Sequence, residues 1–258
     1  MKVEKPMSEI QYVIILQGYP ISSSIGFLGW STAVLIISKK GLYLVDTGAY
    51  NTRKILLERL LELGIPPTSI DGILLTHSHF DHVENIELFP KAKIYMSRKE
   101  YEYALSSEPE KRGDLYVAKT IFWKVSSEKR VKLLEDNEEV VPGLISVSLP
   151  GHTPGSMGYL IKDAKTIIVG DAVKNAYEYN RREPSLVFSS MNEWLQSIEK
   201  ISRIADIIIP GHDIPFKIDS GRAKPMYEQL EIPLIFSINT EKEKLVLKIN
   251  YEQNKIVY

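Results

Sequence analysis

Potential metal ligands are concentrated in the segment 77–82. It reads His-Ser-His-Phe-Asp-His, so three imidazoles and one carboxylate lie within six residues. Residues two apart on extended backbone point the same way, which lets His77 and His79 face one ion together. Asp81 and His82 diverge from them where the chain turns into a predicted helix. One short loop can therefore supply ligands to two ions.

The remaining ligand candidates also follow apolar, strand-like runs. His152 lies in Pro-Gly-His-Thr-Pro-Gly-Ser (150–156), Asp171 follows a glycine, and His212 lies in Pro-Gly-His-Asp (210–213). Imidazole nitrogen and carboxylate oxygen suit zinc, iron, manganese or cobalt. A single histidine is more often a surface or core residue than a ligand, but all five histidines of this chain fall in three such loops. The pattern predicts a metal site.

Short strands must hold these loops in place. Ile73–Leu75 leads into the first histidine segment and residues 207–209 lead into His212, each after a predicted helix. This shared layout predicts two αβ halves, packed sheet to sheet with helices outside. Apolar and β-branched runs predict strands over 12–16, 33–38, 42–45, 73–75, 93–96, 144–149, 158–161, 166–169 and 207–209, and a C-terminal hairpin over 234–238 and 245–249 with a polar turn at 239–244.

Three helices are expected from their boundary signals. Apolar residues at helical spacing over 55–63 predict the first, which Gly64 ends. Ser-Arg-Lys-Glu at 97–100 and Ser-Met-Asn-Glu at 190–193 match the capping box, in which serine and glutamate side chains satisfy free backbone N–H groups. They predict two further helix starts, the second helix running to about Arg203. Residues 101–136 are polar and aromatic and show less regular patterning.

The composition limits the class of protein. A chain of 258 residues, 44% hydrophobic and 25% charged, can bury a core and can form one large domain or two fused halves. With 32 basic and 33 acidic residues there is no electrostatic reason to expect a nucleic-acid or membrane partner. Cysteine is absent, which excludes disulfides and thiolate ligands. No cleavable signal or membrane-spanning run is evident, so we expect a cytoplasmic protein with a small-molecule substrate.

The motifs together resemble the metallo-β-lactamase superfamily. The resemblance rests on His-x-His-x-Asp-His at 77–82, on Val-Asp-Thr-Gly at 45–48 and on the later Gly-His, Gly-Asp and Gly-His loops, and it spans about 10–212. It implies one α+β domain over 1–258. This domain would be an αββα sandwich, in which two packed mixed sheets are flanked by helices and the site lies at one edge between the sheets.

The resemblance also implies a role for each ligand candidate and two divalent ions, with zinc expected and iron or manganese able to use the same ligands. Asp46 would hydrogen-bond to a ligand from behind; alternatively, it caps the turn before the first helix. The implied ligands are His77, His79 and His152 for a first ion; Asp81, His82 and His212 for a second; and Asp171 as a bridge between them.

Such a site indicates hydrolysis. Two divalent ions about 3.5–4 Å apart can share a water, lower its pKa toward about 7 and polarise a carbonyl or phosphoryl oxygen. Asp81 is the natural catalytic group to receive or relay a proton, because its second oxygen stays free if it binds an ion through only one. A redox or purely structural metal site is the alternative from another class, although structural zinc sites are usually closed and single.

Within the superfamily, acyl-homoserine lactonases match the length and layout best, which predicts hydrolysis of a small ester of lactone type. These lactonases carry a tyrosine three residues after the bridging aspartate, where this chain has Lys174; whether Lys174 or Tyr177 takes that role stays open. A glutathione-thioester hydrolase like glyoxalase II and an RNA phosphodiesterase are the alternatives. The aromatic residues among the pocket candidates could equally belong to the core or to a homodimer interface. The pocket candidates are Tyr116, Phe122, Trp123, Lys174, Tyr177, Tyr179, Arg181 and Arg182.

Overall fold

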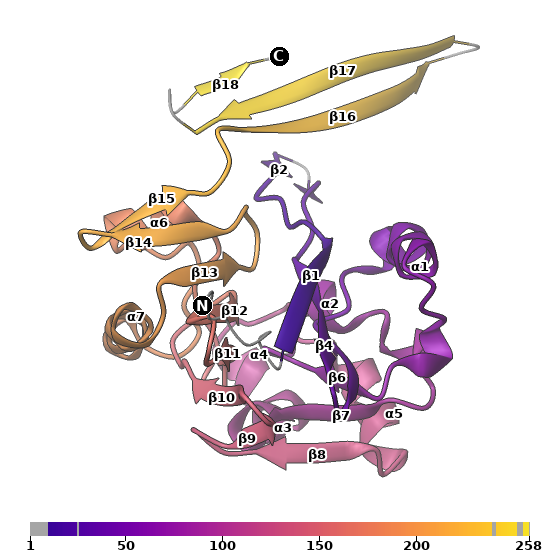
Figure 1. Cartoon of the computed structure of the whole chain (residues 1–258), viewed down its shortest axis with the longest axis vertical. Helices are drawn as coiled ribbons and strands as arrows, with labels where there is room; N and C mark the ends of the chain where they lie inside the picture. Colours follow the sequence, from indigo (N-terminus) through magenta and orange to yellow (C-terminus); the bar gives the residue numbers. More distant parts are fainter. Residues whose placement is uncertain (1–9, 25, 239–240, 252–254, 258) are drawn as a thin grey trace, which may run out of the picture.

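A computed structural model describes residues 10–24, 26–238, 241–251 and 255–257. Two mixed sheets face each other, with α1 (Arg53–Glu62) outside one and α7 (Met191–Ile204) outside the other (Figure 1). This is the expected αββα arrangement. Within the described ranges, none of the helices has the length and apolar character needed to cross a membrane.

The first sheet brings the ends of three parallel strands to one edge. β5, β6 and β7 run parallel, so the loops that follow them leave the sheet on the same side. These loops lead into Asp46, the segment 77–82 and α3 (Arg98–Leu105). The strand order is β1 (Ile10–Leu16), β4 (Ala33–Ser38), β5 (Gly41–Val45), β6 (Gly72–Leu74), β7 (Lys93–Ser97) and β8 (Val131–Leu134).

The second sheet directs three more loops to that region. β12 and β13 are parallel to each other. β10 runs in the same direction, because β10 and β12 are both antiparallel to β11, which lies between them. Their C-terminal ends lead into His152, Asp171 and His212. The order is β15 (Arg222–Pro225), β14 (Phe216–Asp219), β13 (Ile207–Pro210), β12 (Thr166–Gly170), β11 (Met157–Ile161), β10 (Leu144–Ser148) and β9 (Glu139–Val141).

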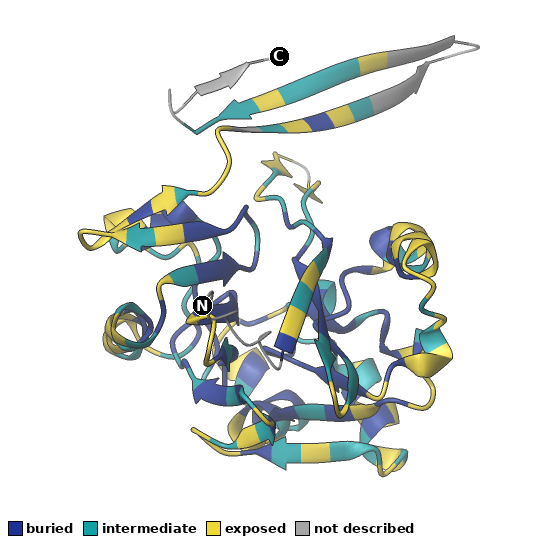
Figure 2. Ribbon diagram, in the orientation of Figure 1, coloured by how far each residue is buried: buried dark blue, intermediate teal, exposed yellow. Residues whose placement is uncertain are grey.

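The central strands are buried on both faces. In β4, Val34 and Ile36 pack between the sheets, whereas Ala33 and Leu35 pack toward the outer helices. On the other side, Trp194 of α7 is fully buried against the second sheet. Figure 2 shows the strands mostly buried and the outer side of α1 exposed. Two-sided burial explains the near-continuous apolar strand sequences, and it holds the loop ends on a rigid frame.

Smaller elements surround this frame. The hairpin of β2 (Ser22–Ser23) and β3 (Gly26–Phe27) and a separate C-terminal sheet lie toward the same end of the molecule (Figure 1). That sheet consists of β16 (Gln229–Ile238), β17 (Glu241–Asn250) and β18 (Lys255–Val257). The short helices are α2 (Phe80–Val83), α4 (Glu108–Lys111), α5 (Lys119–Ser127) and α6 (Ala176–Arg181).

Nine predicted strands and the starts of all three predicted helices are confirmed to within two residues. Ser190 accepts a hydrogen bond from the Glu193 backbone N–H at 3.2 Å, as the capping box predicts. Two expectations are wrong. Residues 241–244 belong to β17 rather than to a turn, because the backbone pairing of the hairpin continues to Ile238 and Glu241; residues 239–240 lie outside the described chain. The Ser97 side chain makes no cap hydrogen bond, and the Glu100 side chain is buried, where it accepts hydrogen bonds from Ser78 and Thr153 instead.

Candidate metal centre

All seven predicted ligands meet at the shared edge of the two sheets, where they form groups that could hold metal ions. The first group is His77, His79 and His152, whose ligand atoms lie within 4.8 Å of one another. His152 Nε2 is 3.0 Å from His79 Nδ1. Although His79 and His152 are 73 residues apart, β6 and β10 from different sheets place them side by side.

The second group is Asp81, His82 and His212, also with ligand atoms within 4.8 Å of one another. His212 Nε2 lies 3.3 Å from Asp81 Oδ2, and His82 Nε2 lies 3.8 Å from the same oxygen. The first turn of α2 carries Asp81 and His82 away from His77 and His79, as the sequence predicts.

Asp171 lies between the two groups. Its Oδ1 is 3.1 Å from His212 Nε2 and 3.2 Å from His82 Nε2, while its Oδ2 is 3.5 Å from His152 Nε2. One carboxylate oxygen therefore faces each group, the arrangement that a bridging ligand requires.

The buried atoms at the centre fit a cation. His77 Nε2, His82 Nε2 and Asp171 Oδ1 are buried without a hydrogen-bond partner among the described residues. Unpaired polar atoms are costly to bury and rare in folded proteins. Positive ions facing these nitrogen and oxygen lone pairs would satisfy them, and the donor set is one that zinc and similar metals accept.

Electrostatics separates the histidines of the two groups. Burial, followed by the neighbouring imidazoles, holds the pKa of His77 well below its ordinary value. Burial likewise lowers the pKa of His152. Burial alone would also lower the pKa of His82, but Asp81, Asp46 and Asp171 outweigh it and raise that pKa. The second group is thus the more negatively charged cation site.

In each of the five imidazoles, the ring nitrogen that faces away from the centre has a hydrogen-bond partner. Backbone carbonyls can only accept a hydrogen bond, so those facing His152 and His212 place the proton on Nδ1 and leave Nε2 free for an ion. The partners are Thr76 Oγ1 for His77 (3.1 Å), Asp114 Oδ2 for His79 (3.0 Å), Asp46 Oδ2 for His82 (2.7 Å), the Leu186 carbonyl for His152 (3.1 Å) and the Trp30 carbonyl for His212 (3.1 Å).

Asp46 contacts His82 on the side that faces away from the centre of the site. It is buried, has a φ of 56°, and accepts hydrogen bonds from the Thr76 backbone N–H at 2.8 Å and the Thr76 hydroxyl at 2.7 Å, besides His82. It makes no cap hydrogen bond to α1 or to the short turn before it. The hydrogen bond to a ligand candidate is confirmed, and the capping alternative is wrong.

Sequence reasoning missed two supporting carboxylates. Asp114 accepts hydrogen bonds from Tyr103 Oη at 2.9 Å and from the Tyr116 backbone N–H at 3.1 Å, in addition to contacting His79. It lies just after α4 in the irregular region, and nothing in its local pattern signals the contact. Glu100 has a signal, the apparent capping box, but the pattern points to the wrong partner.

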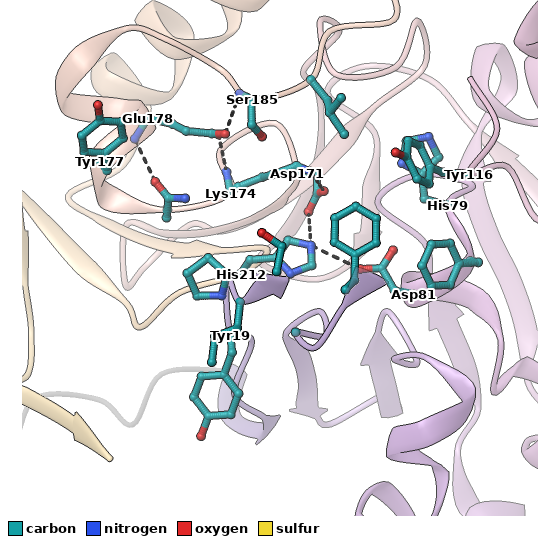
Figure 3. A pocket seen from close by; sticks show the side chains of 18 of the residues that line it. Tyr19, His79, Asp81, Tyr116, Asp171, Lys174, Tyr177, Glu178, Ser185 and His212 are labelled. Carbon is teal, nitrogen blue, oxygen red and sulfur yellow. Dashed lines mark hydrogen bonds and ion pairs between the residues drawn. The ribbon is translucent and has the colours of Figure 1, made fainter. Parts of the chain in front are cut away.

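A cavity of about 490 Å³ opens onto Asp81, Asp171 and His212 (Figure 3). Lys174 Nζ lies 3.2 Å from Asp171 Oδ2 within it. Of the predicted pocket residues, Tyr116, Lys174 and Tyr177 line this cavity. The others do not: Phe122 packs in the core, Trp123 is exposed elsewhere, Tyr179 is buried against Ser202, and Arg181 and Arg182 lie outside the lining.

Residues 28–212 match the sequence profile of the metallo-β-lactamase superfamily. The chain belongs to this superfamily and is a metal-dependent hydrolase of it. A probable metallo-hydrolase of Methanocaldococcus jannaschii is 30% identical over 211 residues, covering 78% of this chain and 92% of that protein. An N-acyl homoserine lactonase of a Bacillus species is 29% identical over 162 residues, covering 60% of each.

Solved structures show the same fold. A putative metallo-β-lactamase from Thermotoga maritima superposes with a TM-score of 0.65 and 25% identity, over 81% of this chain and 99% of that one. An N-acyl homoserine lactone hydrolase, solved with N-hexanoyl-L-homoserine at its catalytic metal centre, gives a TM-score of 0.62 at 22% identity, over 80% and 93% of the chains.

Proposed function

We propose that this chain is a dinuclear metal-dependent hydrolase of small uncharged esters, of lactone type. The observation that carries the proposal is Asp171, which presents one carboxylate oxygen to each ligand group beside an open cavity. His77, His79 and His152 would hold one ion, and Asp81, His82 and His212 the other. Two such ions, zinc by expectation, would lower the pKa of a water and polarise a carbonyl oxygen.

Asp81 has the position that a proton acceptor needs. Its side chain is 14% exposed, lines the cavity, and approaches His82 and His212 through Oδ2. The other oxygen is therefore available to take a proton from a water that attacks a substrate in the cavity. The fully buried ligand candidates cannot reach substrate in this way.

Lys174 is better placed than Tyr177 to take the role of the lactonase tyrosine. Its side chain is 18% exposed and its ammonium lies beside Asp171, whereas Tyr177 is 63% exposed and lies farther from the centre (Figure 3). Burial would lower the pKa of Lys174, but Asp171 and Glu178 raise it, so the group stays charged. Lys174 can then donate a hydrogen bond to the carbonyl oxygen as negative charge develops there.

The cavity walls favour an uncharged acyl substrate. Tyr19, Ile21, Phe27 and Phe80 contribute to the lining, and each methylene of an acyl chain buried there would contribute about 0.8 kcal/mol. Among the described lining residues, Lys174 is the one lysine or arginine. Glutathione carries two carboxylates and an RNA strand many phosphates, so the thioester and phosphodiester alternatives receive little support. The lactonase names among the relatives point the same way.

Other parts of the proposal stay predictions. The nearly balanced charge, −1 in total, supports the expectation of no nucleic-acid or membrane partner. A cytoplasmic location and a homodimer are expectations from the sequence that await direct measurement, by cell fractionation and by light scattering.

Kinetics on the metal-analysed protein test the proposed function. We expect about two ions per chain and a higher kcat/KM for a long-acyl homoserine lactone than for S-lactoylglutathione. A preference of tenfold or more for the thioester would overturn the lactone assignment, and hydrolysis without bound metal would overturn the mechanism.

A matched pair of variants tests the role of Lys174. Lys174→Met should lower kcat on the lactone by roughly 10²-fold, as the loss of one oxyanion donor does. Lys217→Met removes an exposed lysine of β14 and should leave kcat unchanged. Because Lys174 also contacts Asp171, the ion content of both variants must be measured alongside.

A further inference from the structure

Glu100 is a fully buried carboxylate that the proposed reaction does not use. It lies in the first turn of α3, and each of its oxygens faces a different loop. Oε1 accepts hydrogen bonds from the Ser78 backbone N–H at 2.9 Å and the Ser78 hydroxyl at 2.6 Å. Oε2 accepts them from the Thr153 hydroxyl at 2.7 Å and the Gly155 backbone N–H at 3.1 Å.

These loops carry the first ligand group. Ser78 lies between His77 and His79, and Thr153 directly follows His152. The first loop leaves one sheet and the second leaves the other. The four hydrogen bonds reach neither Asp81, His82 nor His212. Glu100 therefore connects the two halves of one ligand group and leaves the other group alone.

The contact is tight enough to fix both loops. A Cβ on Gly155 would lie 2.1 Å from the Glu100 backbone nitrogen, so only glycine allows the second loop to approach α3 this closely. The Thr153 hydroxyl gives its hydrogen to Glu100, so it accepts in turn from Ser156 Oγ at 2.7 Å. A charge buried at this depth is costly unless it is fully hydrogen-bonded. A glutamate that only stabilised the N-terminus of α3 could do so while exposed, so the burial of Glu100 points to its contacts with the two loops.

We propose that Glu100 is a positioning residue that holds His77, His79 and His152 in register and thereby sets the affinity of their ion. The inference rests on the proposed function for the identity of the ligands. It adds a residue outside the ligand shell and predicts an effect that is selective for one of the two ions.

Glu100→Gln separates positioning from general stability. An amide accepts hydrogen bonds through one atom only, so whichever way it turns, one loop loses the oxygen that accepts both of its hydrogen bonds. Disturbing a partner outside the ligand shell typically costs 10–100-fold in metal affinity. We expect one Zn²⁺ ion to bind about tenfold or more weakly and the other to keep its affinity, in competition with a chromophoric chelator. Glu102→Gln, an exposed change on the same helix, should alter neither affinity.

Thr153→Val provides a second variant that keeps Glu100 and the shape of the threonine side chain. It should lower the affinity for the same ion, by a smaller factor than Glu100→Gln does. The effects of the two changes on that affinity should be less than additive in the double variant, because both disturb the same contact between Glu100 and Thr153. If both variants hold every ion as tightly as the unmutated chain, or weaken both ions equally, the proposal is overturned. Failure of Glu100→Gln to fold leaves Thr153→Val to decide. The number of ions on the unmutated chain tests the dinuclear function separately.

Discussion

Asp46→Asn should lower the affinity for the ion of the second ligand group, because it changes which ring nitrogen of His82 carries the proton. Asn is among the few residues that tolerate the positive φ of this position, so the backbone needs no rearrangement. The amide oxygen can accept from the backbone N–H of Thr76, which is fixed and always a donor. Its NH₂ group then faces His82 Nδ1 in place of the carboxylate oxygen at 2.7 Å. The imidazole responds by moving its proton to Nε2, the atom that the ion needs.

The magnitude follows from the bonds involved. To bind the ion, His82 must return its proton to Nδ1. This loses one hydrogen bond, worth about 0.5–1.5 kcal/mol. It also leaves the His82 Nδ1–H and the new amide NH₂ facing each other as two buried donors, which costs about 1–3 kcal/mol. The total of about 1.5–4.5 kcal/mol corresponds to an affinity about 10- to 2,000-fold weaker for one ion. The other ion is connected to Asp46 only indirectly, through the Thr76 hydroxyl that contacts both Asp46 and His77, so its affinity should change less.

Chelator competition measures both affinities, and nitrogen NMR of the imidazoles reports the tautomer of His82. Asp71→Asn is the control, because Asp71 also accepts a backbone hydrogen bond, from Leu42, but far from the site. If Asp46→Asn binds both ions within threefold of the unmutated chain while His82 keeps its proton on Nδ1, the reasoning is refuted.

Three further outcomes are expected. Asp171→Ala should leave at most one ion per chain by elemental analysis, because no carboxylate then offsets the repulsion between two cations; two retained ions would refute the bridge. Asp81→Asn should lower turnover by roughly 10²–10⁴-fold, and near-native kinetics would reduce Asp81 to a scaffold. Without an ion, Asp171 and Asp81 outweigh burial and raise the pKa of His212 to about 9, so ion binding should release protons below that pH and tighten as pH rises. Calorimetry in buffers of different ionisation enthalpy counts these protons, and no release at pH 7 would contradict the prediction.

The strands and the ligand loops could be predicted because each follows from local pattern. Short runs such as 33–38 are apolar on both faces, and the histidines stand directly where such runs end. The first helix was recognisable for the same reason, although its predicted apolar residues include Ile55 and Leu61, which are exposed. Only one stripe of a surface helix faces the core, and Leu56 and Leu60 form it.

The supporting residues could not be predicted because their partners are distant in the sequence. Asp114 reaches His79 from 35 residues away, and the carbonyl of Trp30 reaches His212 across 182 residues. A backbone carbonyl leaves no trace in the residue type. Glu100 illustrates the reverse problem: Ser97-Arg98-Lys99-Glu100 has a plausible local use, and the tertiary contacts override it.

Both ligand groups draw on both sheets, and this has a consequence for the order of assembly. His77 and His79 belong to one half and His152 to the other; His82 and His212 divide in the same way. Neither half alone can offer a complete set, so an ion cannot serve as a seed around which one half folds. Each proposed ion would therefore bind only after the two halves have packed together. We expect metal depletion to weaken the packing between the two sheets before it unfolds either half.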